Sequence, residues 1–384
     1  MTLGSIALAL ALAAGKDPVF LGLDLEFGHQ TSTSAEAVQR GVELAIAEVN
    51  AAGGVLGGRP LEAVVLPNRA VPARGIENVK TFSALKDAVA MFCGKFSPVV
   101  LEEISALHEN EMIMLDPWAA ADTIVDNGKQ PNYVFRLSLK DAWAMKTLLD
   151  HATSRGFERV ALLLPNTGWG RSSAAAAEAY TKTHRSPRIV ATRWFNWGVE
   201  TFAEDYAAFR AAGAEALVFV TNEGPGAVMV REVAALPPEK RMPILAHHGV
   251  AGGDLVTLSG PALGQVDLQV VQFFTFMGNQ RPQARELLAA IEKRYGVQDA
   301  AHVLSAGGVA AAHDLTHLIA MAIQKAGTTD RKAVRKALEE LREYDGIVKK
   351  FARPFTPERH EALSSEDLFM ARFTAEGALV RIPR

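Results

Sequence analysis

Short apolar runs alternate with longer amphipathic stretches through most of the chain from Val19 onward. This alternation is typical of a parallel sheet whose two faces are covered by helices, because each crossover between parallel strands needs a connection about as long as a helix. A first strand is predicted over 19–25, and a capping box at 33–36 followed by one apolar face predicts the next helix. The chain is therefore predicted to be an α/β protein.

The strand and helix pattern occurs in two series. Further strands of the first series are predicted at 61–66, 88–93, 112–115 and 133–137, and those of the second at 160–164, 189–194, 216–220 and 244–246. Because 384 residues exceed what one hydrophobic core usually serves, we expect two similar, doubly wound lobes. The last third departs from the pattern, with helices predicted at 282–295 and 305–326 and a closing hairpin at 368–373 and 378–382.

The composition excludes several classes of protein. Hydrophobic residues make up 49% and charged residues 22% of the chain, which is ordinary for a soluble globular protein. The formal charge is -3 and no dense basic block is present, so nucleic acid is not an expected partner. Cys93 is the single cysteine, which excludes an intrachain disulfide and predicts a small core residue rather than a reactive nucleophile.

Residues 1–14, MTLGSIALALALAA, form a short apolar run that ends in small residues. This composition predicts a secretory signal peptide, and its length is too short for a membrane-spanning helix. No Lys or Arg precedes the run. Either the true start therefore lies upstream or the segment is a non-polar N-terminus.

One segment carries a specific resemblance to a known family. Residues 41–61, GVELAIAEVNAAGGVLGGRPL, resemble the first helix and following turn of the type I periplasmic solute-binding proteins of the branched-chain amino acid (leucine/isoleucine/valine-binding) group. Looser likenesses are Lys95-Phe96-Ser97, Asp116-Pro117-Trp118-Ala119-Ala120-Ala121, Tyr133-Val134-Phe135-Arg136, Trp169-Gly170 and His313-Asp314-Leu315.

The resemblance implies an architecture and a function. It implies two α/β lobes joined by three hinge crossings, with 16–137 plus 272–345 in the first lobe and 138–271 plus 346–384 in the second. It also implies a periplasmic protein without catalytic residues or cofactor, which captures an amino acid or small carboxylate-bearing solute between its lobes and delivers it to an ABC transporter permease. We expect a monomer.

In the first lobe the expected ligand contacts follow the ends of strands, where an open α/β sheet places its binding site. Ser97 precedes a proline at a predicted helix start, and Lys95 adds a charge nearby. The resemblance implies that Ser97 holds a ligand carboxylate; the plain alternative is that Ser97 only caps its helix.

The resemblance also implies ligand contacts from the loop after the fourth strand. It implies backbone contacts from Ala119 and Ala121, because no threonine stands at Ala120 or Ala121. Trp118 replaces a small residue, so it should narrow the cleft or stack on the ligand, unless it packs on its own lobe. Phe96 completes the candidate contacts of this lobe, and Glu26 opens a turn, 26–32, that should also line the cleft.

The second lobe should supply three further contacts. Trp169 corresponds to a ligand-covering aromatic residue of the family, and Glu223 lies at the expected cleft edge, where a helix-start carboxylate is the alternative interpretation. His248 stands where the family has the acid that binds a ligand ammonium. Since histidine is not a permanent anion, either Glu223 performs that task or the ligand has no ammonium.

Other functional classes have weaker support. Adjacent His247 and His248 with His29 suggest a metal, but they lack HxxxH spacing and a cysteine partner, so no metal is expected. No GxSxG, HExxH or Rossmann GxGxxG motif indicates an enzyme. A sensor that docks on a signalling partner would share the fold and stays open as an alternative.

Overall fold

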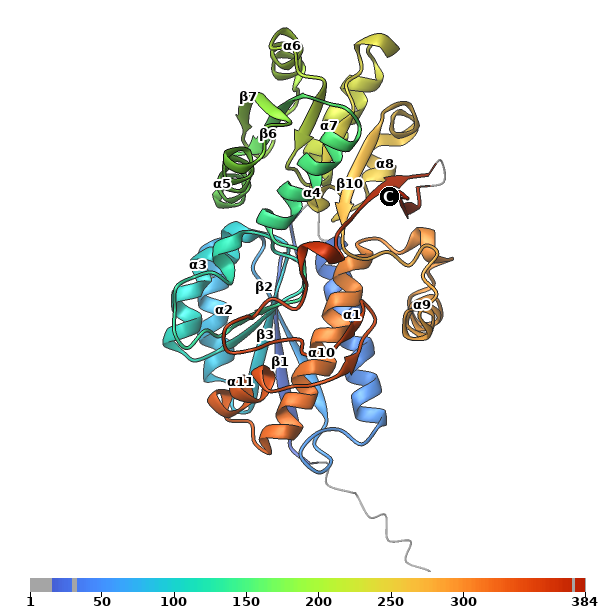
Figure 1. The fold of residues 1–384 in the computed structure, drawn as a ribbon. Coiled ribbons are helices and arrows are strands. Elements are labelled where there is room, and N and C mark those ends of the chain that lie inside the picture. Colours follow the sequence, from blue (N-terminus) through green and yellow to red (C-terminus); the bar gives the residue numbers. More distant parts are fainter. Residues whose placement is uncertain (1–15, 30–32, 375–376, 384) are drawn as a thin grey trace, which may run out of the picture.

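A computed structural model describes residues 16–29, 33–374 and 377–383. The predicted signal segment at 1–14 and the tip of the closing hairpin at 375–376 lie outside the described residues. Two lobes are stacked one on the other, each built around its own sheet (Figure 1).

The first lobe contains a five-stranded parallel sheet in the order β2-β1-β3-β4-β5. Its strands are β1 (Val19–Leu25), β2 (Leu61–Pro67), β3 (Ala88–Cys93), β4 (Ile113–Asp116) and β5 (Val134–Arg136). Its helices are α1 (Thr33–Ala51), α2 (Pro72–Ala84), α3 (Ser97–Glu109), α9 (Pro282–Tyr295), α10 (Ala306–Ala326) and α11 (Arg331–Glu339).

Both faces of this sheet are covered. On β3, Met91 and Cys93 pack with residues of α2 and α3, whereas Ala90 and Phe92 pack into the core that α1 and α10 share. Every residue of β3 is buried, as expected for a central strand of a parallel sheet covered on both sides. Burial raises the pKa of the Cys93 thiol well above its usual range, which keeps it protonated.

The second lobe contains a seven-stranded sheet in the order β14-β13-β10-β9-β8-β6-β7. Its strands are β6 (Arg159–Pro165), β7 (Arg188–Phe195), β8 (Ala216–Phe219), β9 (Ile244–Ala246), β10 (Leu268–Gln272), β13 (Phe369–Phe373) and β14 (Leu379–Arg381). β13 runs antiparallel to both β10 and β14. Its helices are α4 (Asp141–Ser154), α5 (Gly168–Thr183), α6 (Ala203–Ala211), α7 (Glu223–Ala234) and α8 (Leu255–Ser259).

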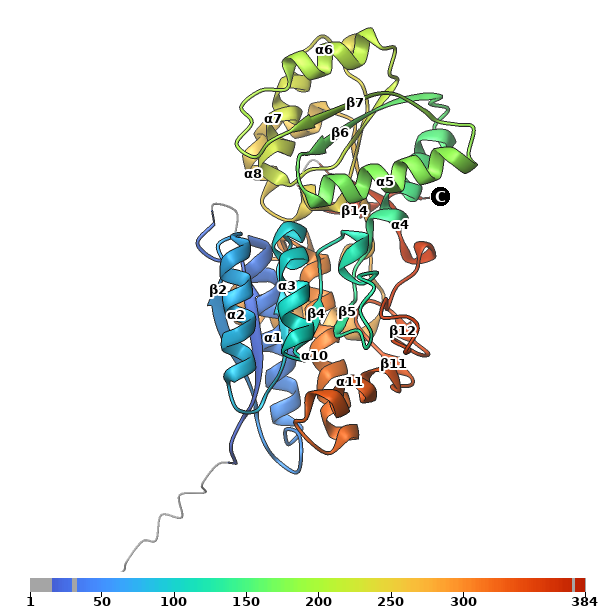
Figure 2. The same cartoon turned by 90° about the vertical axis from the view of Figure 1, so that its left-hand side faces the viewer.

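The chain passes between the lobes three times, at 137–140, 273–281 and about 364–368. The predicted fold class, two α/β lobes with three crossings, is confirmed. Figure 2 shows the narrow junction where these crossings run.

The third crossing corrects one predicted boundary. Residues 346–363 belong with the first lobe, not with the second as the sequence indicated. The amides of Ile347 and Val348 donate to Asp314 of α10, and Ala362 donates its amide hydrogen to the carbonyl of Arg136 at the end of β5. The short hairpin of β11 (Tyr344–Asp345) and β12 (Lys350–Phe351) lies within this segment. No local sequence pattern indicates which lobe this segment joins, because its contacts are with residues far away in the sequence.

α10 is long and apolar enough to cross a membrane by length and composition alone. In the structure it is a core helix, because 83% of its most apolar window is buried and it packs against α1 and α11. Its apolar character is therefore explained by burial within the first lobe.

Candidate functional site

The two lobes contact each other through side chains that follow the carboxyl ends of their strands. Lys95, after β3, donates from Nζ to both carboxylate oxygens of Glu223, the first residue of α7, at 2.8 and 3.0 Å. The exposed fractions of the two side chains are 0% and 1%. The sequence suggested that Lys95 contributes to binding a ligand anion and that Glu223 binds a ligand ammonium or marks a helix start. The structure pairs the two charges with each other across the junction.

A second interlobe contact joins two rings. Trp118 of the first lobe stacks on His248 of the second, with ring centroids 5.2 Å apart and 26° between the planes. Burial, together with His247 and Arg136 nearby, lowers the pKa of His248 well below its usual range. The ring is therefore neutral. Trp118 also packs on its own lobe, over Gly308 of α10, where any Cβ would collide with the indole.

Ser97 does not cap its own helix. α3 begins at Ser97 with Phe96 as the N-cap residue, and the Ser97 hydroxyl oxygen accepts the backbone hydrogens of Ala120 and Ala121 at 3.2 and 3.3 Å. Of the two residues to which the resemblance assigns backbone contacts with the ligand, Ala121 thus donates its amide hydrogen to Ser97, and Ala119 donates its own to Asp116. The hydroxyl hydrogen of Ser97 is not used by these two bonds.

Arg136 holds the loop that carries Trp118 and Ala119. Its side chain is fully buried; Nη1 donates to the carbonyl oxygens of Ala119 and Ala121 at 3.0 Å each. Nε and Nη2 form a bidentate pair with Glu361 at 2.9 and 2.6 Å. Asp116 lies 3.8 Å from Nη1 and accepts the amide hydrogens of Trp118 and Ala119. Sequence reasoning singled out none of these three charged groups as a support of the loop.

Asp141, at the first crossing, orients the aromatic residue of the second lobe. Its Oδ1 accepts a hydrogen bond from Trp169 Nε1 at 3.1 Å and lies 3.1 Å from His247 Nε2. The Trp169 ring meets His247 edge to face at 5.1 Å. Trp169 is buried, and it is not among the residues that line the interlobe cavity described below.

Glu26 lies behind the junction. Its carboxylate accepts a hydrogen bond from Ser34 and packs over Gly94, where any Cβ would collide with Oε2. Burial raises the pKa of Glu26, although the positive charge of Lys95 opposes the shift. The turn that Glu26 opens continues into 30–32, which lie outside the described residues.

A cavity of about 640 Å³ opens beside these contacts, and its walls come from both lobes. Glu223 and Phe96 belong to it, and the other lining residues are His29, Arg69, Ala70, Pro98, Val99, Thr167, Trp197, Gly198, Val199, Asn222, Gly224 and Pro225. Phe96 and Trp197 face each other edge to face across the lobes at 6.4 Å. The volume of the cavity is typical of a small-molecule site.

Arg69 and Trp197 are two of the cavity residues that sequence reasoning missed. Arg69 follows the carboxyl end of β2, and Trp197 follows that of β7. The strand-end rule that selected Lys95 would also have selected these two. The guanidinium of Arg69 lies beside Gly28, and no hydrogen bond or ion pair engages it within the described part of the chain.

The segment between β4 and β5 also carries a carboxyl group whose protonation affects stability. Burial and the nearby carboxylate of Asp141 raise the pKa of Asp122 from 3.8 to about 6. The folded state thus binds its proton more tightly than the unfolded state does. The stabilisation by this proton is complete below pH 3.8 and is lost as pH rises to about 6.

We therefore expect Asp122→Asn to raise the free energy of unfolding at pH 7 by about 1–3 kcal/mol. The amide oxygen of Asn can still accept the Ala142 amide hydrogen that Asp122 Oδ1 accepts at 3.0 Å. This gain in the free energy of unfolding should disappear below the ordinary pKa of Asp. Urea unfolding of both proteins from pH 3.5 to 7.5 would measure it. Asp126→Asn, at an exposed pair with Lys140, is the control. If the free energy of unfolding changed with pH in the same way for the wild type and for Asp122→Asn, the raised pKa of Asp122 would be contradicted.

Two doubly wound lobes with three crossings and a cavity walled by both define a two-lobed ligand-binding protein. The chain belongs to the periplasmic binding protein family, whose model matches residues 18–378.

Individual relatives agree with this membership. The "Leu/Ile/Val-binding protein homolog 1" of Brucella abortus is 23% identical over 346 residues, which cover 87% of this chain and 86% of that protein. A type 1 periplasmic binding protein from Bordetella pertussis has a TM-score of 0.85 at 21% identity, covering 95% of this chain and all of the other. An ABC transporter solute-binding protein from R. palustris, solved with benzoate, has a TM-score of 0.78 at 16% identity and 95% coverage of each chain.

Proposed function

We propose that this protein is the extracytoplasmic solute-binding component of an ABC importer, which captures a small molecule between its lobes and presents it to a permease. The observation that carries the proposal is the cavity of about 640 Å³ with walls from both lobes. A ligand held there contacts both lobes at once, so its binding favours the arrangement in which they meet. Membership of a family of solute-binding proteins supports this function over catalysis.

The chemistry of the cavity favours a small carboxylate with an apolar or aromatic body. Phe96 and Trp197 supply aromatic walls, and Trp197 is 39% exposed, so its ring is accessible. Arg69 supplies a guanidinium at the cavity wall, and guanidinium groups bind carboxylates with two parallel hydrogen bonds. The solute-binding protein from R. palustris, solved with benzoate, is consistent with this class of ligand.

A free amino acid is the second candidate. The name of the Brucella relative favours it. Glu223 is the acid that lines the cavity, and its two oxygens accept hydrogen bonds from Lys95. An ammonium group would have to compete with Lys95 for this carboxylate. The Lys95–Glu223 pair therefore disfavours a ligand ammonium.

We expect Arg69→Ala to weaken the binding of benzoate by tenfold or more, because a hydrogen bond to a charged group contributes roughly 1.5–3 kcal/mol. The loss of affinity is measured by thermal shift with benzoate, benzamide and isoleucine, because a ligand that binds only the folded state raises the melting temperature of the protein. Benzoate should stabilise the wild type more than neutral benzamide does. Arg74→Ala, an exposed arginine of α2 outside the cavity, should bind as the wild type.

The same screen separates the two ligand classes. Stabilisation by isoleucine that survives Arg69→Ala and is lost in Glu223→Gln would replace the carboxylate proposal with the amino acid.

A further inference from the structure

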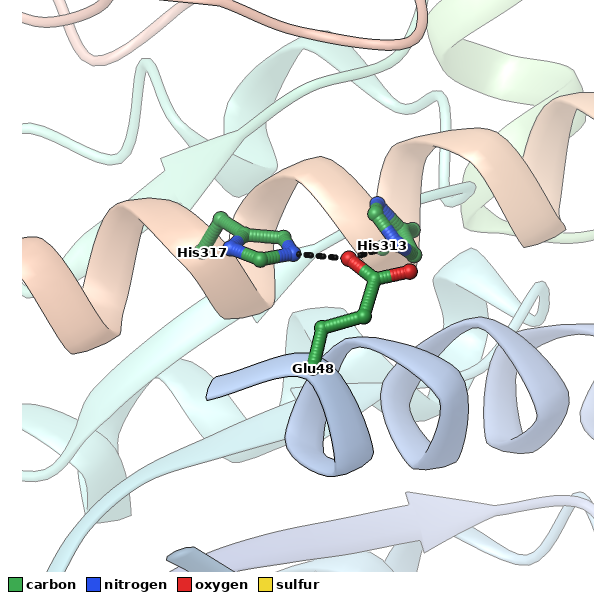
Figure 3. A group of neighbouring side chains, drawn as sticks. All are labelled: Glu48, His313 and His317. Atoms are coloured by element: carbon green, nitrogen blue, oxygen red, sulfur yellow. Dashed lines mark hydrogen bonds and ion pairs between the residues drawn. The ribbon is translucent and has the colours of Figure 1, made fainter. Parts of the chain in front are cut away.

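The first lobe contains a cluster of three metal-ligating side chains away from the cavity. His313 and His317 lie four residues apart on α10, so their side chains project from the same face of the helix. Glu48 extends toward both from α1, which packs alongside (Figure 3). The expectation of no metal considered His29, His247 and His248 and overlooked the HxxxH spacing at His313–His317.

We propose that Glu48, His313 and His317 form a binding site for a divalent transition-metal ion, with Zn²⁺ as the best fit. Two imidazole nitrogens with one carboxylate oxygen are a common set of protein ligands for zinc sites that keep an open position. The proposal does not depend on the solute that the cavity holds.

The distances between the donor atoms suit such an ion. Glu48 Oε2 lies 2.9 Å from His317 Nε2 and 3.2 Å from His313 Nε2, and the three ligand atoms all lie within 4.8 Å of one another. Ligands at about 2.0–2.1 Å from a tetrahedral zinc ion are separated by about 3.3 Å. The two oxygen-to-nitrogen distances are therefore within a few tenths of an ångström of a coordinated arrangement.

His313 gives an independent indication of a ligand. Its side chain is 5% exposed, and neither ring nitrogen has a well-oriented hydrogen bond among the residues that the structure describes. Its Nε2 lies within ion-pair distance of Glu48, but outside hydrogen-bond geometry. Buried polar atoms without partners are uncommon because they lose their hydration without compensation. A metal ion between the imidazole and the carboxylate would satisfy this nitrogen.

The cluster is accessible from solvent. A pocket of about 230 Å³ leads to the cluster, and Glu286 and Asp345 also line it. These acids attract a cation, and the pocket leaves room for water at the remaining coordination position.

The neighbouring segment is held in place by a second network. Asp314, between the two histidines, accepts hydrogen bonds from the Tyr344 hydroxyl at 2.8 Å and from the amides of Ile347 and Val348. The Tyr344 ring lies roughly parallel to His317, with centroids 6.4 Å apart. This network limits the freedom of the His317 side chain, which favours preorganised ligands.

The test is a titration of Zn²⁺ into tag-free, EDTA-treated and dialysed protein by isothermal calorimetry. We expect one Zn²⁺ per chain. His317→Ala should weaken binding by about 100-fold or more, and Glu48→Gln by at least tenfold. His317 is 24% exposed, so this variant should fold. His302→Ala removes an exposed histidine paired with Asp299 and should bind Zn²⁺ as the wild type does.

Two results would overturn the site: no saturable Zn²⁺ binding by the wild type, or equal affinity of the wild type and His317→Ala. In either case Glu48 and the two histidines would form ordinary ion pairs. None of the three residues lines the interlobe cavity, so this outcome leaves the proposed solute binding unaffected.

Discussion

Arg136→Met should lower the free energy of unfolding by roughly 3–5 kcal/mol, the usual cost of removing one partner of a buried ion pair. The variant leaves the Glu361 carboxylate, whose two oxygens lie 2.9 and 2.6 Å from the Arg136 nitrogens, without its cation. It also removes two hydrogen bonds to the carbonyl oxygens of Ala119 and Ala121. Urea unfolding measures the change in stability.

Two controls make this result specific to the buried pair. Arg193→Met removes a partly exposed arginine that is paired with Asp205, and it should cost no more than about 1 kcal/mol. The double variant Arg136→Met/Glu361→Leu should recover part of the loss, because no unpaired carboxylate then stays at that position. A loss for Arg136→Met as small as that for Arg193→Met would contradict the structure around Arg136.

Lys95→Met should disfavour the arrangement in which the lobes meet by roughly 3–5 kcal/mol, because Glu223 would be buried without its cation. The two charges come from different lobes and are 0% and 1% exposed. The protein can therefore hydrate Glu223 by opening at the three crossings, without unfolding either lobe. Small-angle scattering should show a larger radius of gyration than for the wild type, while far-UV circular dichroism stays unchanged.

The matched comparison is a double variant. Lys95→Met/Glu223→Gln leaves no unpaired charge, so its radius of gyration should return toward that of the wild type. Lys146→Met, at an exposed pair with Asp150, should have no effect. An unchanged radius of gyration in Lys95→Met would show that this pair does not hold the lobes together.

Most of the fold could be predicted because helices and strands follow local hydrophobic periodicity. The strands at 19–25, 88–93 and 244–246 and the helix at 282–295 have the predicted bounds. The helix α11 (Arg331–Glu339) was missed. The assignment of 346–363 failed because the packing of this segment on Arg136 and Asp314 joins residues far apart in the sequence.

The candidate site was only partly predictable. The rule that ligands bind at the carboxyl ends of parallel strands selected Lys95, Ser97 and Glu223. It could not predict that Lys95 and Glu223 neutralise each other or that Ser97 accepts two backbone hydrogens, because each contact depends on how separate segments are placed. The cluster of Glu48, His313 and His317 could be predicted only in part from the sequence. The HxxxH spacing indicates the two histidine ligands, but no local pattern indicates that α1 supplies the third.

The sequence by itself determined the two α/β lobes, the order of their elements and the family, because backbone preference and apolar periodicity act over neighbouring residues. Only the tertiary structure decided which charges meet across the junction, where the cavity lies and which histidines share a carboxylate. These properties depend on the approach of side chains more than a hundred residues apart, such as Lys95 and Glu223. Such an approach is fixed by the packing of whole lobes.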